Sequence, residues 1–323
     1  MSESKNISVN EYPGGILAVD SGLFRPQMAC CYVIEHAGEA AIVEAGGHLG
    51  AQRLLAVLAQ RGIAKEDVRY VMVTHVHLDH AGGAGLLMEA LPQAQLLVHP
   101  KGAKHMIDPS KLEAGTRAVY GDEKYEQTYG SLIPVPAERV HEVADDERLD
   151  WRGRTLRFID SPGHASHHYC VHDALTNGWF TGDTFGLSYR ELDTENGPFI
   201  FPTTTPIDFD PDALRHSIGR LLDAEPDWMY LTHYGRIGHP EALAPRLVEG
   251  VDAFEAMGLE FEHDDDRVAR IRQAMTDWLM AAARAHGVTL PDARLRELLD
   301  MDIALNVAGI DVWLNRRARR ARQ

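Results

Sequence analysis

The segment THVHLDHAGG, residues 74–83, places four ionisable side chains within six positions: His75, His77, Asp79 and His80. Imidazole and carboxylate groups are ligands that zinc, iron and manganese accept in proteins. His75 and His77 are two residues apart, so an extended chain directs both side chains to one side, while Asp79 and His80 are expected at a turn. Burying these groups without a cation would cost several kcal/mol for each unpaired group. The cluster therefore predicts a metal site.

Three more polar groups follow predicted strands. LRFID leads into SPGH with His164, GWFTG leads into Asp183, and WMYL leads into THYG with His233. Side chains at the ends of neighbouring strands can converge on one cleft, so we expect these three to join the 74–83 cluster. Isolated histidines such as His99, His141 and His286 are interpreted as surface or core residues.

The elements that must position these groups can be read from the apolar pattern. Short β-rich runs dominate the first half, and residues 48–62 have helical spacing that ends at Gly62. Residues 101–140 are long and polar and are interpreted as a partly helical insertion. After about residue 245 the pattern is helical only. Strands alternating with helices, then helices alone, predict an α/β domain over residues 1–245 and a helical extension over residues 246–323.

Composition limits the partners. The chain of 323 residues has 48 acidic and 32 basic residues and a formal net charge of −16, which opposes binding to nucleic acid or anionic membrane. We therefore expect a small-molecule substrate. No run of apolar residues is long enough to span a membrane. The three cysteines lack a C-x-x-C spacing, and a cytoplasmic location is predicted. Basic residues gather only near the C-terminus, where they are interpreted as the cationic, solvated end of a helix: Arg316, Arg317, Arg319, Arg320 and Arg322.

An apolar stripe in the extension must be buried, either on the rest of the chain or on a second copy, and a homodimer is predicted from it. The stripe consists of Leu279, Met280, Ala283, Leu295, Leu298 and Leu299.

The four motifs, in their order, resemble those of the metallo-β-lactamase superfamily over roughly residues 15–240. The resemblance implies a four-layer αββα sandwich with a two-metal site at one edge. Matched motif by motif, His75, His77 and His164 would hold the first metal. Asp79, His80 and His233 would hold the second, and Asp183 would bridge the two. The implied cofactor is two divalent ions per chain, Zn²⁺ first, with Fe and Mn as alternatives. The chain departs from many relatives at VEAGG, where Glu44 replaces an aspartate that usually supports the ligands.

Two metals that share a water can make hydroxide near neutral pH, and no G-x-S-x-G nucleophile motif is present. The resemblance thus implies a dinuclear metal-dependent hydrolase, with Asp79 and Asp183 as catalytic carboxylates, that acts on an ester, thioester or lactone as glyoxalase II and acyl-homoserine lactonases do. The alternatives are a phosphodiesterase, an iron-dependent redox protein (persulfide dioxygenase or oxygen-binding diiron type) and a non-catalytic assembly protein. Acidity disfavours the nucleases, and Asp183 disfavours true β-lactamases.

Further residues are expected near the site. By the family pattern His168 supports the ligands, whereas His167 is interpreted as a surface residue. Tyr189 and Tyr234 can each hydrogen-bond a substrate carbonyl or be purely structural. Aromatic residues between positions 185 and 209 either form an apolar pocket wall or pack the helical extension, and both interpretations stay open: Phe185, Tyr189, Phe199 and Phe201.

Overall fold

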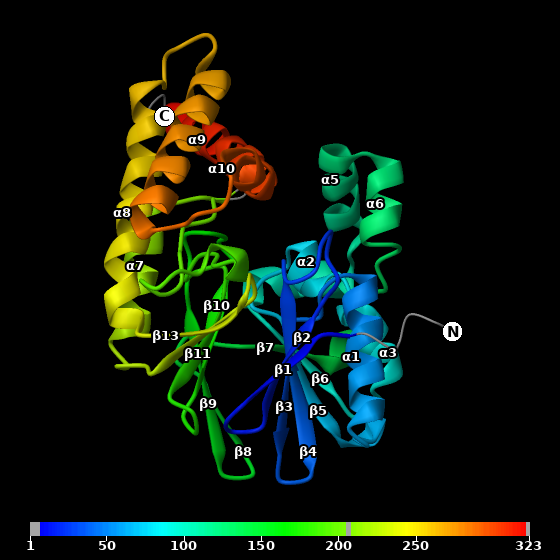
Figure 1. The fold of residues 1–323 in the computed structure, drawn as a ribbon. Helices are drawn as coiled ribbons and strands as arrows, with labels where there is room; N and C mark the ends of the chain where they lie inside the picture. Colours follow the sequence, from blue (N-terminus) through cyan, green and yellow to red (C-terminus); the bar gives the residue numbers. More distant parts are fainter. Residues whose placement is uncertain (1–6, 205–207, 321–323) are drawn as a thin grey trace. The chain divides into compact units, whose positions relative to one another are not determined.

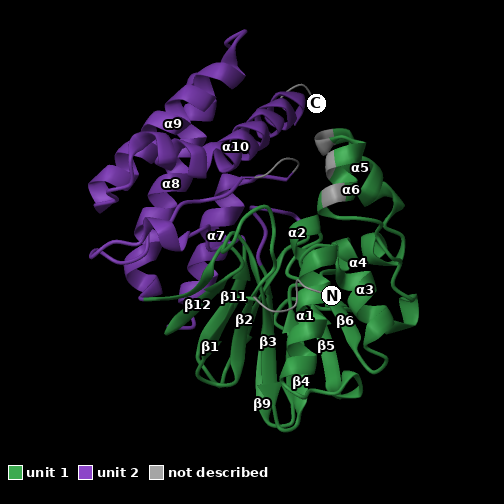
Figure 2. Ribbon diagram, turned by 45° about the vertical axis from the view of Figure 1, so that its right-hand side comes forward, with its two compact units in different colours: residues 1–160, 167–182, 226–238 green, residues 161–166, 183–225, 239–323 purple. Residues whose placement is uncertain are grey.

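The computed structural model describes residues 7–204 and 208–320. The chain folds into two compact units (Figure 2). Unit 1 comprises residues 1–160, 167–182 and 226–238, and unit 2 comprises residues 161–166, 183–225 and 239–323.

Unit 1 contains two mixed β-sheets (Figure 1). The first has seven strands in chain order, with antiparallel pairs from β1 to β4 and parallel pairs from β4 to β7. Its strands are β1 (Val9–Tyr12), β2 (Ile16–Asp20), β3 (Cys30–His36), β4 (Glu39–Val43), β5 (Val68–Met72), β6 (Gln95–Val98) and β7 (Val140–Glu142).

The second sheet has six strands in the order β13-β12-β11-β10-β9-β8, and its β11–β12 pair is parallel. Its strands are β8 (Arg148–Trp151), β9 (Arg154–Asp160), β10 (Tyr169–Asp173), β11 (Gly178–Gly182), β12 (Trp228–Leu231) and β13 (Gly235–Gly238). The sequence did not predict β13, because half of its GRIG residues are glycine and carry no strand signal. The backbone hydrogen bonds to β12 hold β13 in the strand conformation.

The first sheet is buried on both faces, because side chains alternate along a strand. Leu17 and Val33 point into a core shared with helices, whereas Ile16 and Tyr32 point into a core shared with the second sheet. This double burial explains why the strands read as continuous apolar runs. The predicted α/β sandwich is confirmed at this level: two mixed sheets face to face, with helices on the first.

The helices of unit 1 connect the strands of the first sheet. They are α1 (His48–Gln60), α2 (Leu78–Ala81), α3 (Ala84–Ala90), α4 (Pro100–Ile107), α5 (Ser110–Tyr120) and α6 (Asp122–Thr128), with 3₁₀ turns η2 (Lys65–Asp67) and η3 (Ala137–Arg139). Leu54 of α1 and Leu87 of α3 are fully buried in the core on the helical face. The insertion over residues 101–140 is partly helical, as predicted, and consists of most of α4 together with α5, α6 and η3.

Unit 2 is mainly helical. It contains α7 (Pro211–Leu222), α8 (Pro240–Glu260), α9 (Arg267–His286) and α10 (Asp292–Arg320), with the 3₁₀ turn η4 (Arg190–Leu192). Helix α7 begins at residues that favour a helix start: the Asp210 side chain accepts a hydrogen bond from Ala213 N at 3.0 Å, and Pro211 follows it. The predicted domain boundary at residue 245 falls inside α8, and the two units divide the chain elsewhere. That boundary therefore stays a prediction.

The apolar stripe of the extension is buried within the single chain, where α8, α9 and α10 pack on one another. Leu279 and Leu299 are fully buried, and the most exposed member, Met280, is 8% exposed. The homodimer consequently stays a prediction that this stripe no longer supports. Among the described residues, no helix combines the length and the apolar character that crossing a membrane requires.

Candidate metal centre

The histidine-rich motif of unit 1 begins two residues after β5 ends at Met72. His77 lies at the N-terminal cap of α2, and its carbonyl accepts a hydrogen bond from His80 N at 3.0 Å. Asp79 and His80 are thus carried by a helix of four residues, where the sequence predicted a turn. The apolar strand and the short helix together direct four polar groups to one end of the sheet.

Glu44 holds this motif in place from the end of β4. Its side chain is 1% exposed, and its Oε1 accepts from Thr74 Oγ1 at 2.5 Å while lying 2.9 Å from His80 Nδ1. The other oxygen, Oε2, accepts from Thr74 N at 3.1 Å, and Thr232 Oγ1 donates to Oε1 at 3.2 Å. One carboxylate therefore orients a histidine and joins the loops after β5 and β12. This is the supporting role expected of Glu44.

Asp79, His80 and His233 form a group of ligand type within unit 1. Asp79 Oδ2 lies 3.5 Å from His80 Nε2 and 3.3 Å from His233 Nε2. Ligands at roughly 2.0–2.1 Å from a shared tetrahedral ion would be about 3.3 Å apart. The second nitrogen of each ring is already engaged: His233 Nδ1 lies 2.8 Å from Met28 O, and His80 Nδ1 faces Glu44. Both Nε2 atoms are thus oriented toward Asp79, and the three residues fit a divalent cation.

A second set of imidazoles lies beside this group in unit 1. His75 Nε2 is 2.8 Å from His77 Nδ1, and the His168 ring stacks on His75 at 4.7 Å with an interplanar angle of 24°. His168 is fully buried, which is consistent with a supporting position. His167, interpreted as a surface residue, is half-buried, and its ring lies 6.2 Å from that of His75 and 5.7 Å from that of His77. The only sequence signal was its position next to His168.

Unit 2 holds the remaining two predicted ligands. His164 Nε2 lies 3.3 Å from Asp183 Oδ2, again the separation expected of two ligands of one ion, and both side chains are buried. His164 Nδ1 is 3.2 Å from the carbonyl oxygen of Thr203. A carbonyl can only accept, so the geometry indicates that Nδ1 carries the proton and that Nε2 presents its lone pair.

Two motif glycines are required by close packing. Gly182 has φ +48°, and a Cβ there would lie 2.4 Å from Thr74 Oγ1 and 2.5 Å from His168 Nε2. Gly163 has φ +131°, and a Cβ there would lie 2.3 Å from Leu214 Cα. Glycine therefore lets the backbone before Asp183 and before His164 approach its neighbours where no side chain fits.

The two tyrosines considered for substrate binding are both buried. Tyr189 donates its hydroxyl to Asp302 Oδ1 of α10 at 3.0 Å within unit 2. Tyr234 is 1% exposed in the core between the sheets, and burial raises the pKa of its phenol well above the usual range, so it stays neutral. Their substrate roles stay predictions.

Of the two interpretations of the aromatic residues, the structure supports packing of the helical extension. Phe185 and Phe201 are fully buried, and the Phe199 ring lies 5.6 Å from the ring of His286 on α9. Phe201 also contacts Phe199 at 5.9 Å and Tyr189 at 6.0 Å between ring centroids. These rings form part of the interior of unit 2.

Two of the three cysteines are held as neutral thiols. Cys30, Cys31 and Cys170 are buried and form no disulfide. Burial raises the pKa of the Cys30 thiol to about 12 and that of Cys31 well above its usual value. Neither of these two is a thiolate near neutral pH, the form that attacks a carbonyl.

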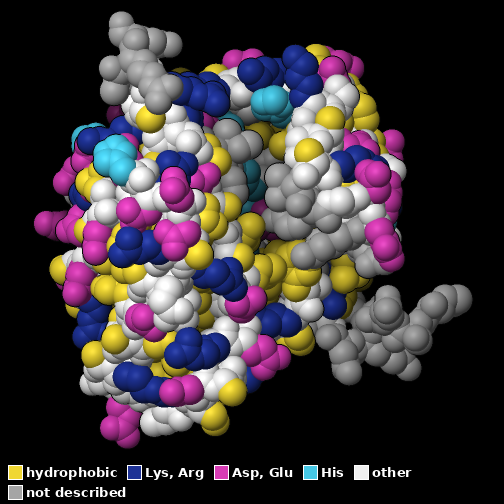
Figure 3. Space-filling view, turned by 90° about the horizontal axis from the view of Figure 1, so that it is seen from above, with side chains coloured by type: hydrophobic (Ala, Val, Ile, Leu, Met, Phe, Trp, Pro, Cys, Tyr) yellow, Lys and Arg dark blue, Asp and Glu magenta, His cyan; other side chains and the backbone are white. Residues whose placement is uncertain are grey.

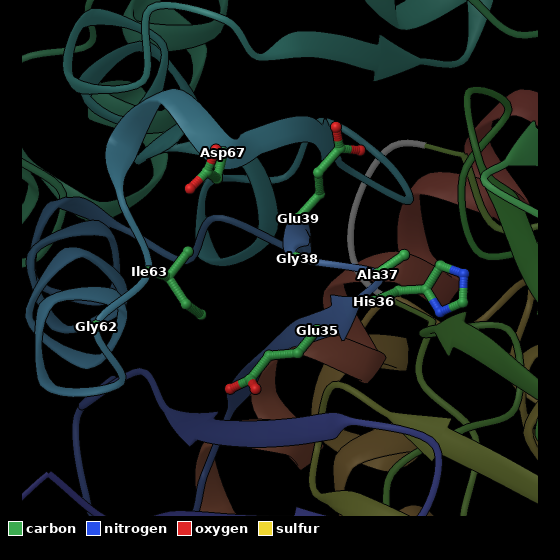
Figure 4. Close-up of a pocket in the computed structure, with 8 residues that line it drawn as sticks. All are labelled: Glu35, His36, Ala37, Gly38, Glu39, Gly62, Ile63 and Asp67. Atoms are coloured by element: carbon green, nitrogen blue, oxygen red, sulfur yellow. The ribbon is translucent and has the colours of Figure 1, made fainter.

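A hollow of about 370 Å³ lies at the opposite end of β4 from Glu44, around the β3–β4 turn (Figure 4). Its carboxylates serve the fold: Glu35 pairs with Arg61 at 2.8 Å, and Glu39 pairs with Arg69 at 2.8 Å. Glu39 also accepts from Arg152 and from Trp151 Nε1, each at 2.8 Å. The hydrogen bond from Arg152, followed by that from Trp151, lowers the pKa of Glu39 to about 2. We assign this hollow no role in the chemistry.

The seven predicted ligands are thus divided between the units. Unit 1 brings together five of them, His75, His77, Asp79, His80 and His233, and unit 2 brings together His164 and Asp183. Each unit contains histidine and aspartate side chains at spacings suited to a divalent ion.

The chain belongs to the metallo-beta-lactamase superfamily, whose family model matches residues 25–233. Members of this family bind divalent metals, and most are hydrolytic enzymes. The match includes all seven predicted ligands and ends at His233.

Three of the similar proteins show what the chain resembles. The metallo-beta-lactamase fold-containing protein ST1585 of Sulfurisphaera tokodaii is 31% identical over 190 residues, 57% of this chain and 65% of that protein. The atrochrysone carboxyl ACP thioesterase of Aspergillus fumigatus is 26% identical over 170 residues, 52% of this chain and 44% of that protein. The hydroxyacylglutathione hydrolase of Aeromonas hydrophila is 26% identical over 155 residues, 47% of this chain and 45% of that protein. The chain thus spans less than two thirds of each relative.

Solved structures confirm the fold. That of ST1585 has a TM-score of 0.63 at 24% identity and covers 92% of this chain and 98% of its own. The chemotaxis sensor ODP, solved as a peroxy diiron species, has a TM-score of 0.52 at 14% identity over 77% of this chain and 98% of its own. At these identities the likeness concerns the fold alone.

Proposed function

We propose that this protein is a dinuclear metal-dependent hydrolase acting on a thioester, ester or lactone carbonyl. The observation that carries the proposal is the Asp79–His80–His233 group, whose facing atoms are separated by 3.3 and 3.5 Å. In the proposal this group holds one ion, His75, His77 and His164 hold the other, and Asp183 is shared. Zn²⁺ is the proposed metal, since it accepts both imidazole and carboxylate ligands.

The two proposed ligands of unit 2 follow strands of unit 1 closely in the sequence. Asp183 is joined by a peptide bond to Gly182, the last residue of β11 in unit 1. His164 follows the end of β9 at Asp160 by four residues. Both ligands of unit 2 are therefore attached by short segments to strands of the sheet whose β12 leads to His233.

In this proposal the residues of the chain orient the site. Hydrogen bonds at Nδ1 of His80, His164 and His233 fix each ring so that Nε2 is the ligand atom. Asp79, whose side chain is 25% exposed, can also accept a proton from an attacking water. Two divalent ions, when bound, supply Lewis acidity and lower the pKa of water.

The substrate class is supported by two relatives of about equal similarity. The names thioesterase and hydroxyacylglutathione hydrolase, at 26% identity each, both describe enzymes that cleave an acyl group from a carrier. We therefore place thioesters first, ahead of lactones and simple esters. The small-molecule substrate, the cytoplasmic location and the absence of nucleic-acid and membrane partners stay proposals.

The test joins metal analysis to a substrate panel. Purified protein loaded with zinc is expected to contain about two ions per chain, because seven ligands exceed the capacity of one four-coordinate site. It should hydrolyse at least one of an acyl-thioester, a lactone and an aryl ester, and Asp79→Ala should abolish that activity. His263→Ala, at an exposed histidine, is the matched control and should keep both metal and activity. One ion per chain after loading, or inertness toward the whole panel, would refute the proposal.

Two other chemistries would give distinct results in the same experiment. Histidine and carboxylate ligands do not choose strongly between zinc and iron, and ODP has the same fold in a diiron state. Iron retention with consumption of oxygen would indicate the redox alternative. Cleavage of a phosphodiester, with thioesters and lactones left intact, would indicate the phosphodiesterase alternative.

A further inference from the structure

Asn306 of helix α10 binds the residues on either side of Thr203, whose carbonyl faces His164. Asn306 is 1% exposed, and its Oδ1 accepts a hydrogen bond from Thr204 N at 2.7 Å. Its own carbonyl accepts from Thr204 Oγ1 at 3.0 Å, and its Nδ2 donates to Pro202 O at 3.4 Å. The residue between these two anchored positions is Thr203, whose carbonyl faces His164 Nδ1. A side chain over one hundred residues away in sequence therefore fixes the acceptor of a proposed metal ligand.

Arg316, near the C-terminal end of the same helix, makes a second contact that leads to the loop of His164. Arg316 Nη1 donates to Asp208 Oδ1 at 2.7 Å, and Asp208 Oδ2 accepts from Ser166 N at 3.2 Å and also from Ser166 Oγ. Burial raises the pKa of Asp208, but the hydrogen bonds from Ser166 and Arg316 outweigh this and lower it, so the carboxylate is ionised near neutral pH. Ser166 is two residues after His164. Arg316 is thus anchored by an ion pair, where the sequence predicted a solvated helix end.

The other arginines described near the C-terminus are more exposed than Arg316. Arg317 lies 3.9 Å from Glu262, with its side chain 55% exposed, and Arg319 and Arg320 are exposed. Arg322 lies outside the described residues. Lysine and arginine side chains alternate with acidic ones on the face shown in Figure 3.

We infer that Asn306 and Arg316 are positioning residues that hold His164 in its ligand orientation, Asn306 through the Thr203 carbonyl and Arg316 through Asp208 and Ser166. The inference rests on the proposed function, in which His164 is a metal ligand. In this inference helix α10 orients His164 in two ways. It holds the carbonyl that faces His164 Nδ1, and it holds the loop that contains His164 and Ser166.

The expected effect is a loss of metal affinity, because a histidine ring that is not held in its ligand orientation binds the ion less well. Changing the hydrogen-bond partner of a metal-bound histidine typically weakens metal affinity by about 10–100-fold. Asn306 acts one step further away, so the lower end, about tenfold, is expected for its loss. Arg316 is partly exposed and acts through a surface ion pair, so about threefold is expected for its loss.

The experiment measures zinc dissociation constants for both sites of the full-length protein by competition with a chromophoric chelator. Asn306→Leu should weaken one of the two sites about tenfold and leave the other within about twofold. Asn306→Asp should restore most of the loss, because a buried carboxyl group that stays neutral can accept from Thr204 and donate to Pro202. Asn315→Ala, at an exposed asparagine of the same helix, and Arg319→Ala are the matched controls and should bind zinc like the unmodified protein.

His164→Ala separates failure of this inference from failure of the proposed function. If His164→Ala leaves both zinc sites intact, His164 is not a ligand and the proposed centre is wrong. If His164→Ala loses zinc while folded Asn306→Leu binds both ions normally, the positioning inference alone is overturned. Should Asn306→Leu not fold, Thr204→Val, which removes only the Oγ1 donor to Asn306, should weaken the same site about threefold; normal binding in that variant would also overturn the inference.

Discussion

Glu44 Oε1 lies 2.9 Å from His80 Nδ1, and both side chains are at most 1% exposed. The two residues are 36 positions apart and follow different strands of the first sheet. The sheet thus brings a carboxylate that is outside the predicted ligand set against a predicted ligand. The orientation of His80 depends on this contact.

The first prediction is that Glu44→Gln weakens binding of one zinc ion by about 10–100-fold, because the uncharged amide is a weaker partner for His80. Binding of the other ion should change much less. Zinc titration with chelator competition measures both constants, and Glu66→Gln, at an exposed position of unit 1, serves as control. Equal affinities in the variant and the unmodified protein would show that His80 does not depend on Glu44.

A second prediction separates a shared ligand from a supporting residue. Asp183→Ala should reduce retention of both ions and abolish hydrolysis, because one carboxylate is proposed to bridge them. His168→Ala removes a ring that stacks on His75 and is outside the proposed ligands, so both ions should remain and activity should fall modestly, by about tenfold. Elemental analysis of the two purified variants decides the matter. Equal metal loss in both would assign His168 to the ligands.

The third prediction concerns the backbone before His164. Gly163→Ala should lower the free energy of unfolding by about 2 kcal/mol or more, because φ is +131° and the new Cβ would overlap Leu214. Gly219→Ala in α7 is the matched control: no atom lies within 4 Å of its ideal Cβ, so about 0.5–1 kcal/mol of stabilisation is expected. Urea unfolding of the two variants measures the difference. A Gly163→Ala protein as stable as its parent would contradict the packing described here.

The fourth prediction is a dependence of stability on pH through Glu39. Its pKa is lowered from 4.5 to about 2 in the folded chain, so its ionised form stabilises the fold at pH values above 4.5. That contribution should be lost as the pH falls through the window from about 4.5 to about 2. Glu39→Gln should therefore be less stable than the parent at pH 7, and the difference should shrink toward pH 2, as urea unfolding at a series of pH values can measure. A difference that grows on acidification would exclude this role.

The fifth prediction distinguishes Arg316 from the basic residues that follow it. Deleting residues 317–323 should leave zinc affinity and hydrolysis of small substrates unchanged, whereas deleting residues 316–323 also removes the Arg316–Asp208 pair and should weaken one zinc site about threefold. Neither form, nor the full chain, should bind duplex DNA or RNA at physiological salt, because the net charge of −16 opposes it. Gel-shift and zinc-competition measurements test both points. Salt-sensitive RNA binding that disappears on truncation would reassign the tail.

Much of the site could be predicted from the sequence because its signal is local. Four ligand-type residues within THVHLDH, and a polar residue after each of three apolar strands, are patterns of neighbours in the chain. The start of α7 is another local signal, because Asp210 and Pro211 are adjacent residues of types that favour a helix start. Strand alternation and capping act over a few residues, so one segment is enough to reveal them.

The residues that support the site were beyond prediction because their partners are remote. The nearness of His167 to His75 was not predicted, because the two residues are far apart in the sequence. Tyr189 and Phe199 could not be assigned to pocket or packing, because their partners lie on α10 and α9.

The sequence by itself therefore determined which chemical groups are available and the strands that present them. Tertiary structure alone decided which nitrogen of His80, His164 and His233 is engaged and that Glu44 faces His80. It also decided that Asn306 and Arg316 bind the segments whose Thr203 and Asp208 contact His164 and Ser166. The reason is physical: ligand type is a property of a residue, whereas ring orientation depends on hydrogen bonds between segments that only the folded chain brings together.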